Sequence, residues 1–366
     1  MASSLPDNPS LEALAEEARG GQEESVARKY GFNGWPALVH YLEAAAELSV
    51  DPSRFDEHAA APADRFCALA TLRYDDADAP PRRQAATELL RADPGLAGHH
   101  VWAAAAAADP RALTALLRDD PALASAPGGP YGWVPLMYLA YSRVPQHDSV
   151  RAARMLLDAG ADPNAGYLWR GMSTPFTVLT GVFGEGEQGP RRQPRHPLAA
   201  DLADLLLRRG AHPVDQQTLY NRMFRPDDSH LELLFAHGLA DAGPGPWERR
   251  LGAAMETRAQ MWQRQVSWAA ENGFTDRLAL LARHGVDVSG VDPMLPRMPD
   301  DPNARDADGA TALHHAAWSG DLTLIRELLA AGADPTLRDT RFDATAQGWA
   351  RHAYQDEAAE LLNPDR

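Results

Sequence analysis

Residues 308–335 read Asp308-Gly-Ala-Thr-Ala-Leu-His-His-Ala-Ala-Trp-Ser-Gly320-Asp-Leu-Thr-Leu-Ile-Arg-Glu-Leu-Leu-Ala-Ala-Gly332-Ala-Asp-Pro335. The Asp-Gly pair predicts a turn, Thr311 can cap a short helix of small residues, and Gly320 ends that helix. A second helix follows with an apolar stripe that must be covered, and Gly332 predicts its left-handed C-terminus. Two such helices cannot bury their own apolar faces. The pattern therefore predicts a unit that stacks on similar units.

This stretch resembles an ankyrin repeat in four segments: Thr311-Ala-Leu-His314-His-Ala316-Ala, Gly320, Leu328-Leu329 and Gly332-Ala-Asp-Pro335, with Ala312 in place of the family's usual proline. The resemblance covers roughly residues 63–363 and is sharpest over 303–362. It implies an all-α solenoid of helix-turn-helix repeats. A chain of 366 residues, 45% of them hydrophobic, is long enough for one continuous solenoid.

Paired leucines before a stop signal recur along the chain and predict eight helical pairs, and therefore about seven or eight repeats, several of them degenerate. The pairs begin at Leu89, Leu116, Leu156, Leu206, Leu233, Leu280, Leu328 and Leu361. The spacing of the closing glycines mostly exceeds the family period of about 33 residues. Inserted loops are therefore expected near 144–148, 184–197, 242–258 and 289–302.

Three of these insertions have a predicted conformation. Residues 184–197 are rich in glycine, proline and arginine and are expected to be mobile. Residues 247–261 have helical spacing and are expected to extend the helix that follows them. Residues 291–302 contain four prolines and are expected to be extended.

The first 62 residues are predicted to form a separate N-terminal helical cap and linker, ahead of a solenoid over 63–366. Helical patterns cover 11–19, 23–29 and 37–48, and Tyr30, Phe32 and Trp35 are expected to pack these helices together. The segment 27–38 is similar to one found ahead of ankyrin repeats in many actinobacterial proteins. A capping role is expected because a solenoid needs a terminal unit with a polar outer face.

Composition and charge limit the possible function. The net charge of −16 argues against a nucleic-acid or anionic-membrane target. Cys67 is the sole cysteine, so neither an internal disulfide nor a cysteine zinc site is possible, which fits a reducing cytoplasm. No uncharged run approaches the roughly 18 residues of a spanning helix, and no export signal is visible, so a cytoplasmic protein is predicted.

Candidate binding residues follow from the resemblance, which places one position of each first helix toward a concave groove. These positions hold Tyr138, Val178, Asn221, Trp268, His315 and Trp349, and Trp318 and His352 lie one turn further on. Aromatic side chains on an exposed groove are typical of binding hot spots. The alternative is that some of them pack between repeats.

Catalytic signals are weak. His314 is expected to be structural, Cys67 lies in an apolar run, and no metal, phosphate or dinucleotide motif is found. We therefore expect a non-catalytic module that binds a neutral-to-basic protein or peptide, without cofactor or metal. The alternative is an enzyme whose insertions close a small-molecule pocket around Tyr138, Trp268, His315 and Trp349, with Glu271 or Asp343 as proton carrier.

Overall fold

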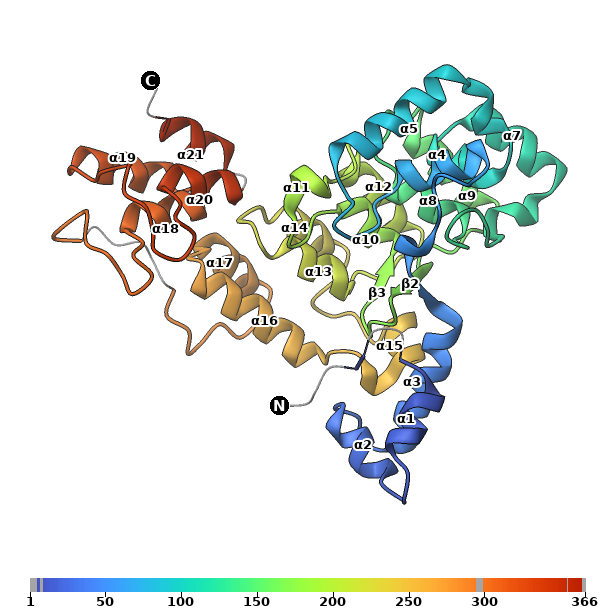
Figure 1. Ribbon diagram of the computed structural model, residues 1–366, viewed down its shortest axis with the longest axis horizontal. Coiled ribbons are helices and arrows are strands. Elements are labelled where there is room, and N and C mark those ends of the chain that lie inside the picture. The colour runs from blue at the N-terminus through green and yellow to red at the C-terminus, as the bar shows by residue number, and fades with distance from the viewer. Residues whose placement is uncertain (1–4, 7–8, 294–298, 354, 364–366) are drawn as a thin grey trace. The chain divides into compact units, whose positions relative to one another are not determined.

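The computed structural model describes residues 5–6, 9–293, 299–353 and 355–363 (Figure 1). The chain is mostly helical, as expected. It divides into two compact units: unit 1 comprises Met1–Asn221 and Leu233–Arg258, and unit 2 comprises Arg222–Glu232 and Ala259–Arg366. The boundaries of these units do not coincide with the expected boundary at residue 62.

The predicted helical pairs are present in the described residues. In unit 1 they are α4 (Pro62–Ala70) with α5 (Pro80–Ala92), α6 (Val101–Ala106) with α7 (Pro110–Asp119), α8 (Pro135–Tyr141) with α9 (Ser149–Asp158), and α10 (Val178–Phe183) with α12 (Ala199–Arg208). The helices α13 (Gln216–Arg222) and α14 (Ser229–Ala236) follow. The last three pairs are α16 (Arg258–Glu271) with α17 (Thr275–Arg283), α18 (Ala312–Ser319) with α19 (Leu322–Ala330), and α20 (Ala346–His352) with α21 (Asp356–Leu361).

The same local signals begin and end the second helix of several pairs. The side chains of Asp109, Asp148 and Asp321 accept hydrogen bonds from backbone amides in the first turns of α7, α9 and α19. The glycines that close five of these helices have positive φ, from 79° to 97°, which only glycine adopts readily; they are Gly160, Gly210, Gly238, Gly285 and Gly332. The second helices that carry these signals can therefore be located from the sequence.

The sequence did not indicate the small sheet in unit 1. Its strands are β1 (Ser49–Val50), β2 (Gly166–Trp169) and β3 (Pro175–Thr177), in the order β1-β2-β3. β1 and β2 are parallel, and β2 and β3 are antiparallel. The sheet thus connects the N-terminal region to the repeats of unit 1.

The N-terminal helices have the expected positions: α1 (Leu11–Glu17), α2 (Glu23–Lys29) and α3 (Trp35–Leu48). Phe32 lies in their core and Tyr30 and Trp35 pack against it, as predicted; Tyr41 is a further member of this core. The inserted helix α15 (Pro246–Leu251) lies beside α3 (Figure 1) and contributes Leu251 to this core. The expectation that α15 would extend α16 is wrong, because Gly252 turns the chain at φ 54°.

The segment 184–197 is held by several contacts, in contrast to the expectation that it is mobile. It contains the short helix α11 (Gly189–Arg192), and the guanidinium of Arg83 donates to the carbonyls of Arg191 and Arg192. Gln193 is buried and donates to Asp78. Side chains of α5 and of the loop before it therefore hydrogen-bond to this segment at several points. Its glycines and prolines alone had suggested a segment without such contacts. Of the proline-rich insertion, residues 294–298 lie outside the described residues.

Unit 2 has a core of its own, built from the facing sides of its last four helices. Leu313 of α18, Ile325 and Leu328 of α19, Ala350 of α20 and Leu362 after α21 are buried together. The burial of one apolar side of each helix leaves the opposite sides of α18 and α20 free to line a surface.

Candidate functional site

A cleft of about 560 Å³ lies on unit 2, over the first helices α16, α18 and α20 and the turn that precedes α20. Three tryptophans, a phenylalanine and two histidines dominate its walls. The lining residues are Trp268, Glu271, Asn272, His315, Trp318, Arg341, Phe342, Ala344, Gly348, Trp349 and His352. A volume of this size is in the range of ligand-binding clefts.

Trp349 is the centre of the aromatic cluster in this cleft. Its ring centroid lies 6.1 Å from that of Trp318 and 6.3 Å from that of Phe342, with interplanar angles of 77° and 72°. His315 packs edge-on against Trp349 at 5.5 Å, and His352 stacks on Trp318 at 5.8 Å. Perpendicular neighbours at these distances are favourable aromatic pairs, so the rings support one another.

The buried carboxylate of Asp339 positions both Trp349 and the turn that carries Phe342. It accepts hydrogen bonds from the amides of Phe342 (2.6 Å), Arg341 (2.8 Å) and Ala344 (3.1 Å), and from the Trp349 indole (2.9 Å). Burial alone would raise the pKa of Asp339, but the hydrogen bonds from Phe342, Trp349, Ala344 and Arg341 lower it to about 2. The carboxylate is therefore ionised at neutral pH and holds the turn.

The turn itself presents an exposed aromatic side chain. Phe342 is 63% exposed, and Asp343 beside it has a φ of 49°, a left-handed conformation that is unusual for a residue other than glycine. Arg338 donates to Asp343 at 2.8 Å, and the Arg338–Thr345 bridge closes the base of the turn. Phe342 is thus displayed by a backbone that is fixed at several points.

The two other tryptophans of the cleft, Trp268 and Trp318, are each held by a contact with another residue of unit 2. The Trp318 indole donates to the Asn272 amide oxygen at 2.8 Å. Trp268 packs edge-on against Phe224 at 5.0 Å. All three tryptophans are half-buried, so each has one part in the protein and another available to the cleft.

The adjacent histidines have different roles. His314 is buried, accepts the Thr311 amide at Nδ1 and donates from Nε2 to the Ala344 carbonyl. Burial lowers the pKa of His314, so it is neutral at pH 7. This connection between repeats is the structural role expected for it. His315 instead lines the cleft and donates from Nε2 to Asp306 at 2.8 Å.

The charged side chains of the cleft are Glu271 and Arg341. Glu271 is exposed at the end of α16, and its carboxylate has neither an ion pair nor a hydrogen bond among the described residues. The Arg341 guanidinium lies over the Phe342 ring, 5.0 Å from its centroid, and 3.9 Å from the carboxylate of Asp308. The arginine is therefore partly neutralised, whereas the glutamate is not.

The structure brings five of the predicted site residues into this one cleft: Trp268, His315, Trp318, Trp349 and His352. Phe342 was missed because it lies in the turn, not on a first helix. The available signal was an aromatic residue between Arg341 and Asp343, a place where turns normally carry polar side chains.

The other predicted positions lie in unit 1, and the expectation that they face an open groove is corrected. Tyr138 is fully buried because the loop before α8 covers it. Its hydroxyl donates to the Gly128 carbonyl at 2.8 Å and accepts the Tyr131 amide. Asn221 is 2% exposed and accepts from Gln217, and Val178 is fully buried.

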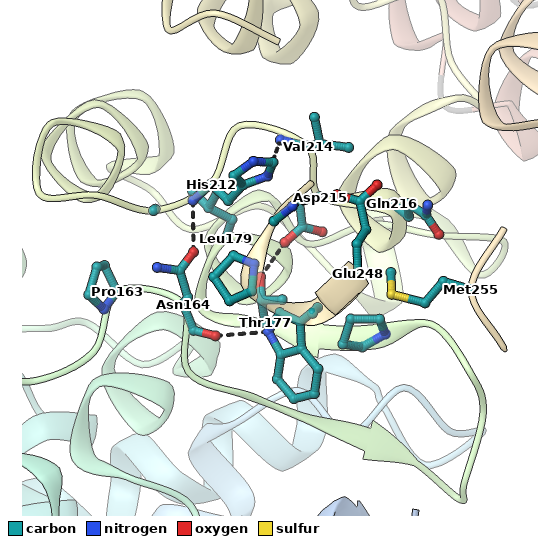
Figure 2. A pocket seen from close by; sticks show the side chains of 15 residues that line it. Pro163, Asn164, Thr177, Leu179, His212, Val214, Asp215, Gln216, Glu248 and Met255 are labelled. Atoms are coloured by element: carbon teal, nitrogen blue, oxygen red, sulfur yellow. Dashed lines mark hydrogen bonds between the residues drawn. The ribbon is translucent and has the colours of Figure 1, made fainter. Parts of the chain in front are cut away.

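A second, very small cavity of about 20 Å³ lies in unit 1 (Figure 2). Figure 2 shows the hydrogen bonds that join its walls: Asn164 accepts the His212 amide, and Thr177 donates to Asp215. Burial raises the pKa of Asp215, which also caps α13 by accepting the Thr218 amide. A volume of this size holds about one water molecule and leaves no room for a ligand. The polar groups of its walls instead join neighbouring repeats.

Neither a metal-ligand cluster nor a membrane-spanning helix is present in the described part of the chain. No group of three or more histidine, cysteine or acidic residues there could hold a metal ion. Within the same residues, none of the helices has the length and apolar character needed to span a membrane.

The comparisons with known proteins agree with this architecture. A family model described as ankyrin repeats (3 copies) matches residues 261–339, and one described as ankyrin repeat matches residues 131–166. A stretch of 62 residues, 17% of the chain, is 39% identical to the inactive serine/threonine-protein kinase TEX14 of Mus musculus and covers 4% of that protein. The matches place ankyrin repeats in both units, and Trp268, His315 and Trp318 lie within the matched residues.

Proposed function

We propose that this chain, a mostly helical protein with ankyrin repeats, is a binding module whose aromatic cleft in unit 2 holds a protein or peptide. Ankyrin repeats generally mediate protein–protein interactions. The observation that carries the proposal is Phe342, a large apolar side chain left 63% exposed at the edge of a cleft lined by three tryptophans. Exposed apolar surface of this kind marks interaction sites.

The rigidity of the cleft supports high affinity. Asp339 holds the turn and Trp349 together, and Asn272 orients Trp318 before any partner arrives. Because these side chains are ordered beforehand, a partner loses less conformational entropy on binding. Clustered tryptophans are also the residues that most often dominate binding energy. The acidic chain favours a neutral-to-basic partner.

An enzyme is the second candidate, and the His315–Asp306 pair favours it, because a carboxylate that orients a histidine is a common catalytic arrangement. The cleft nevertheless has no serine, threonine, cysteine or lysine among its lining residues. The cleft is open to solvent, because four of its lining residues are exposed: Glu271, Arg341, Phe342 and His352. The arrangement therefore suits surface recognition better than sequestered chemistry.

The proposal is tested by Phe342→Ala. Peptides selected against the full chain from a displayed random library provide the ligand, and isothermal titration gives the dissociation constant. Because Phe342 is largely exposed, its removal is expected to raise the dissociation constant at least about tenfold, equivalent to about 1.4 kcal/mol, and to lower the melting temperature only slightly.

Met172→Ala is the matched control. Met172 is 45% exposed and belongs to the β2–β3 turn of unit 1, so its loss should change neither affinity nor melting temperature. Trp268→Ala and Trp349→Ala should also weaken binding at least about tenfold, but require melting curves because both rings pack against other residues. Equal affinities of the Phe342→Ala variant and the wild type would refute the assignment of the cleft.

A further inference from the structure

The cleft combines aromatic walls with a carboxylate that has no partner among the described residues. Glu271 is exposed beside Trp268 and Asn272, and all three line the cleft. A partner that contributes only apolar groups would desolvate this carboxylate without compensation, at a cost of free energy. The juxtaposition therefore favours a ligand group that is both cationic and able to pack on rings.

The orientation of the rings strengthens this selection. The ring planes of Trp318 and Phe342 are nearly perpendicular to that of Trp349. The polar edges of both indoles are already engaged, with Asn272 and Asp339, so a ligand contacts these residues through their rings. The face of an aromatic ring is electron-rich and attracts cations, most strongly in tryptophan.

A guanidinium fits this arrangement better than an ammonium. It is planar, stacks on aromatic rings and presents a fork of N–H donors to a carboxylate, whereas an ammonium is compact and strongly hydrated. The chain itself shows such packing at this cleft, where the Arg341 guanidinium lies over Phe342. A second guanidinium, that of Arg170 in unit 1, lies 4.5 Å from the ring of Trp169.

The charge of the surroundings does not oppose a cationic ligand. Residues 259–366 contain 17 acidic residues and 10 arginines, with no lysine. Arg341 lies beside Asp308, and Asp306 accepts from His315 at the edge of the cleft. The net charge of residues 259–366 is therefore negative even with Arg341, the one arginine of the cleft, included. A negative net charge attracts a basic segment.

We propose that the cleft binds an arginine side chain of an extended peptide segment, with the guanidinium packed on the Trp318–Trp349 rings and paired with Glu271. The inference rests on the proposed function and specifies the chemistry of the partner. A volume of about 560 Å³ exceeds that of one side chain, so residues next to the arginine also contact Phe342 and Trp268.

The test uses four Gly/Ser heptapeptides that carry arginine, citrulline, lysine or leucine at the central position. Citrulline keeps the planar shape of arginine without its charge. Each peptide is titrated into the full chain, with the indole N–H signals of the tryptophans followed by NMR. The arginine peptide is expected to shift the signals of Trp318 and Trp349 and to bind at least fivefold more tightly than the citrulline and lysine peptides.

Glu271→Gln is expected to weaken binding of the arginine peptide at least fivefold and to bring its affinity close to that of the citrulline peptide. Glu327→Gln is the matched control, because Glu327 is an exposed acid on α19 that does not line the cleft. The indole spectrum of each free variant verifies its fold. A loss of affinity in Glu271→Gln that is absent in Glu327→Gln supports recognition of a cation.

Three results overturn the inference: equal affinities of the arginine and citrulline peptides, an unchanged affinity in Glu271→Gln, or the absence of any shift at Trp318 and Trp349 with the arginine peptide. None of these results decides the proposed function, which depends on the effect of Phe342→Ala on library-selected peptides. If that substitution has no effect either, both proposals fail.

Discussion

Asp339 has more influence on the cleft than its lack of contact with solvent suggests. One buried carboxylate satisfies three backbone amides of the turn and the Trp349 indole. Without it, those partly buried donors lose their acceptor, which costs free energy beyond the loss of the hydrogen bonds themselves. The position of Phe342 and that of Trp349 therefore depend on the same side chain.

Asp339→Asn should accordingly destabilise unit 2 by about 2 kcal/mol at pH 7, because the hydrogen bonds to a charged acceptor are lost or weakened. The effect must depend on pH. The pKa of about 2 in the folded state lies below the ordinary value of an unfolded aspartate, about 3.9, so the stabilisation is fully present above about pH 4 and is lost as the pH falls toward 2.

Urea unfolding of the wild type and of Asp339→Asn at pH 7, 4 and 2.5 measures this difference in stability. The difference between the two unfolding free energies should be largest at pH 7 and clearly smaller at pH 2.5, where Asp339 begins to be protonated in the folded state. A difference that stays constant across this range would mean that the charge of Asp339 does not support the turn.

Single elements show which features the sequence could predict. The second helices were found because an apolar stripe and a closing glycine are local signals, as in α19 with Leu328 and Gly332. The sheet was not found, since β1 and β2 are two and four residues long and pair residue 49 with residue 168. Pairing between such distant segments leaves no periodicity in either one.

The site was predictable to the extent that it belongs to the repeat. Trp268, His315 and Trp349 occupy one repeated position on successive first helices, so the template brought them together. The same template failed at Tyr138 and Asn221, because loops specific to unit 1 cover those helices. Phe342 belongs to a turn whose conformation depends on Asp339, and only the three-dimensional structure reveals that dependence.

Leu328 tests the packing of α19 against its neighbours. It is fully buried among residues of α18, α20 and α21, so Leu328→Ala should destabilise the protein by about 2–5 kcal/mol through lost burial and a residual cavity. Thr323→Ala, an exposed position on the same helix, should change stability by less than about 0.5 kcal/mol. Equal effects in chemical unfolding would contradict the assigned interface.

At the scale of the whole molecule, the negative charge and the aromatic cleft have separate effects on binding. The excess of acidic residues is spread along the chain and attracts a basic partner over a distance, an effect that salt screens. The tryptophans and Phe342 act only at contact, so they determine how slowly the partner leaves.

The most direct measurement follows all nine indole N–H signals of the full chain by NMR while a library-selected peptide is added. Four tryptophans belong to unit 2 and five to unit 1, so both units report at once. Binding in the cleft of unit 2 should shift the signals of Trp268, Trp318 and Trp349 and leave those of Trp35, Trp102, Trp133, Trp169 and Trp247 unchanged. Shifts confined to the five tryptophans of unit 1 would contradict the claim that the cleft of unit 2 is the binding surface.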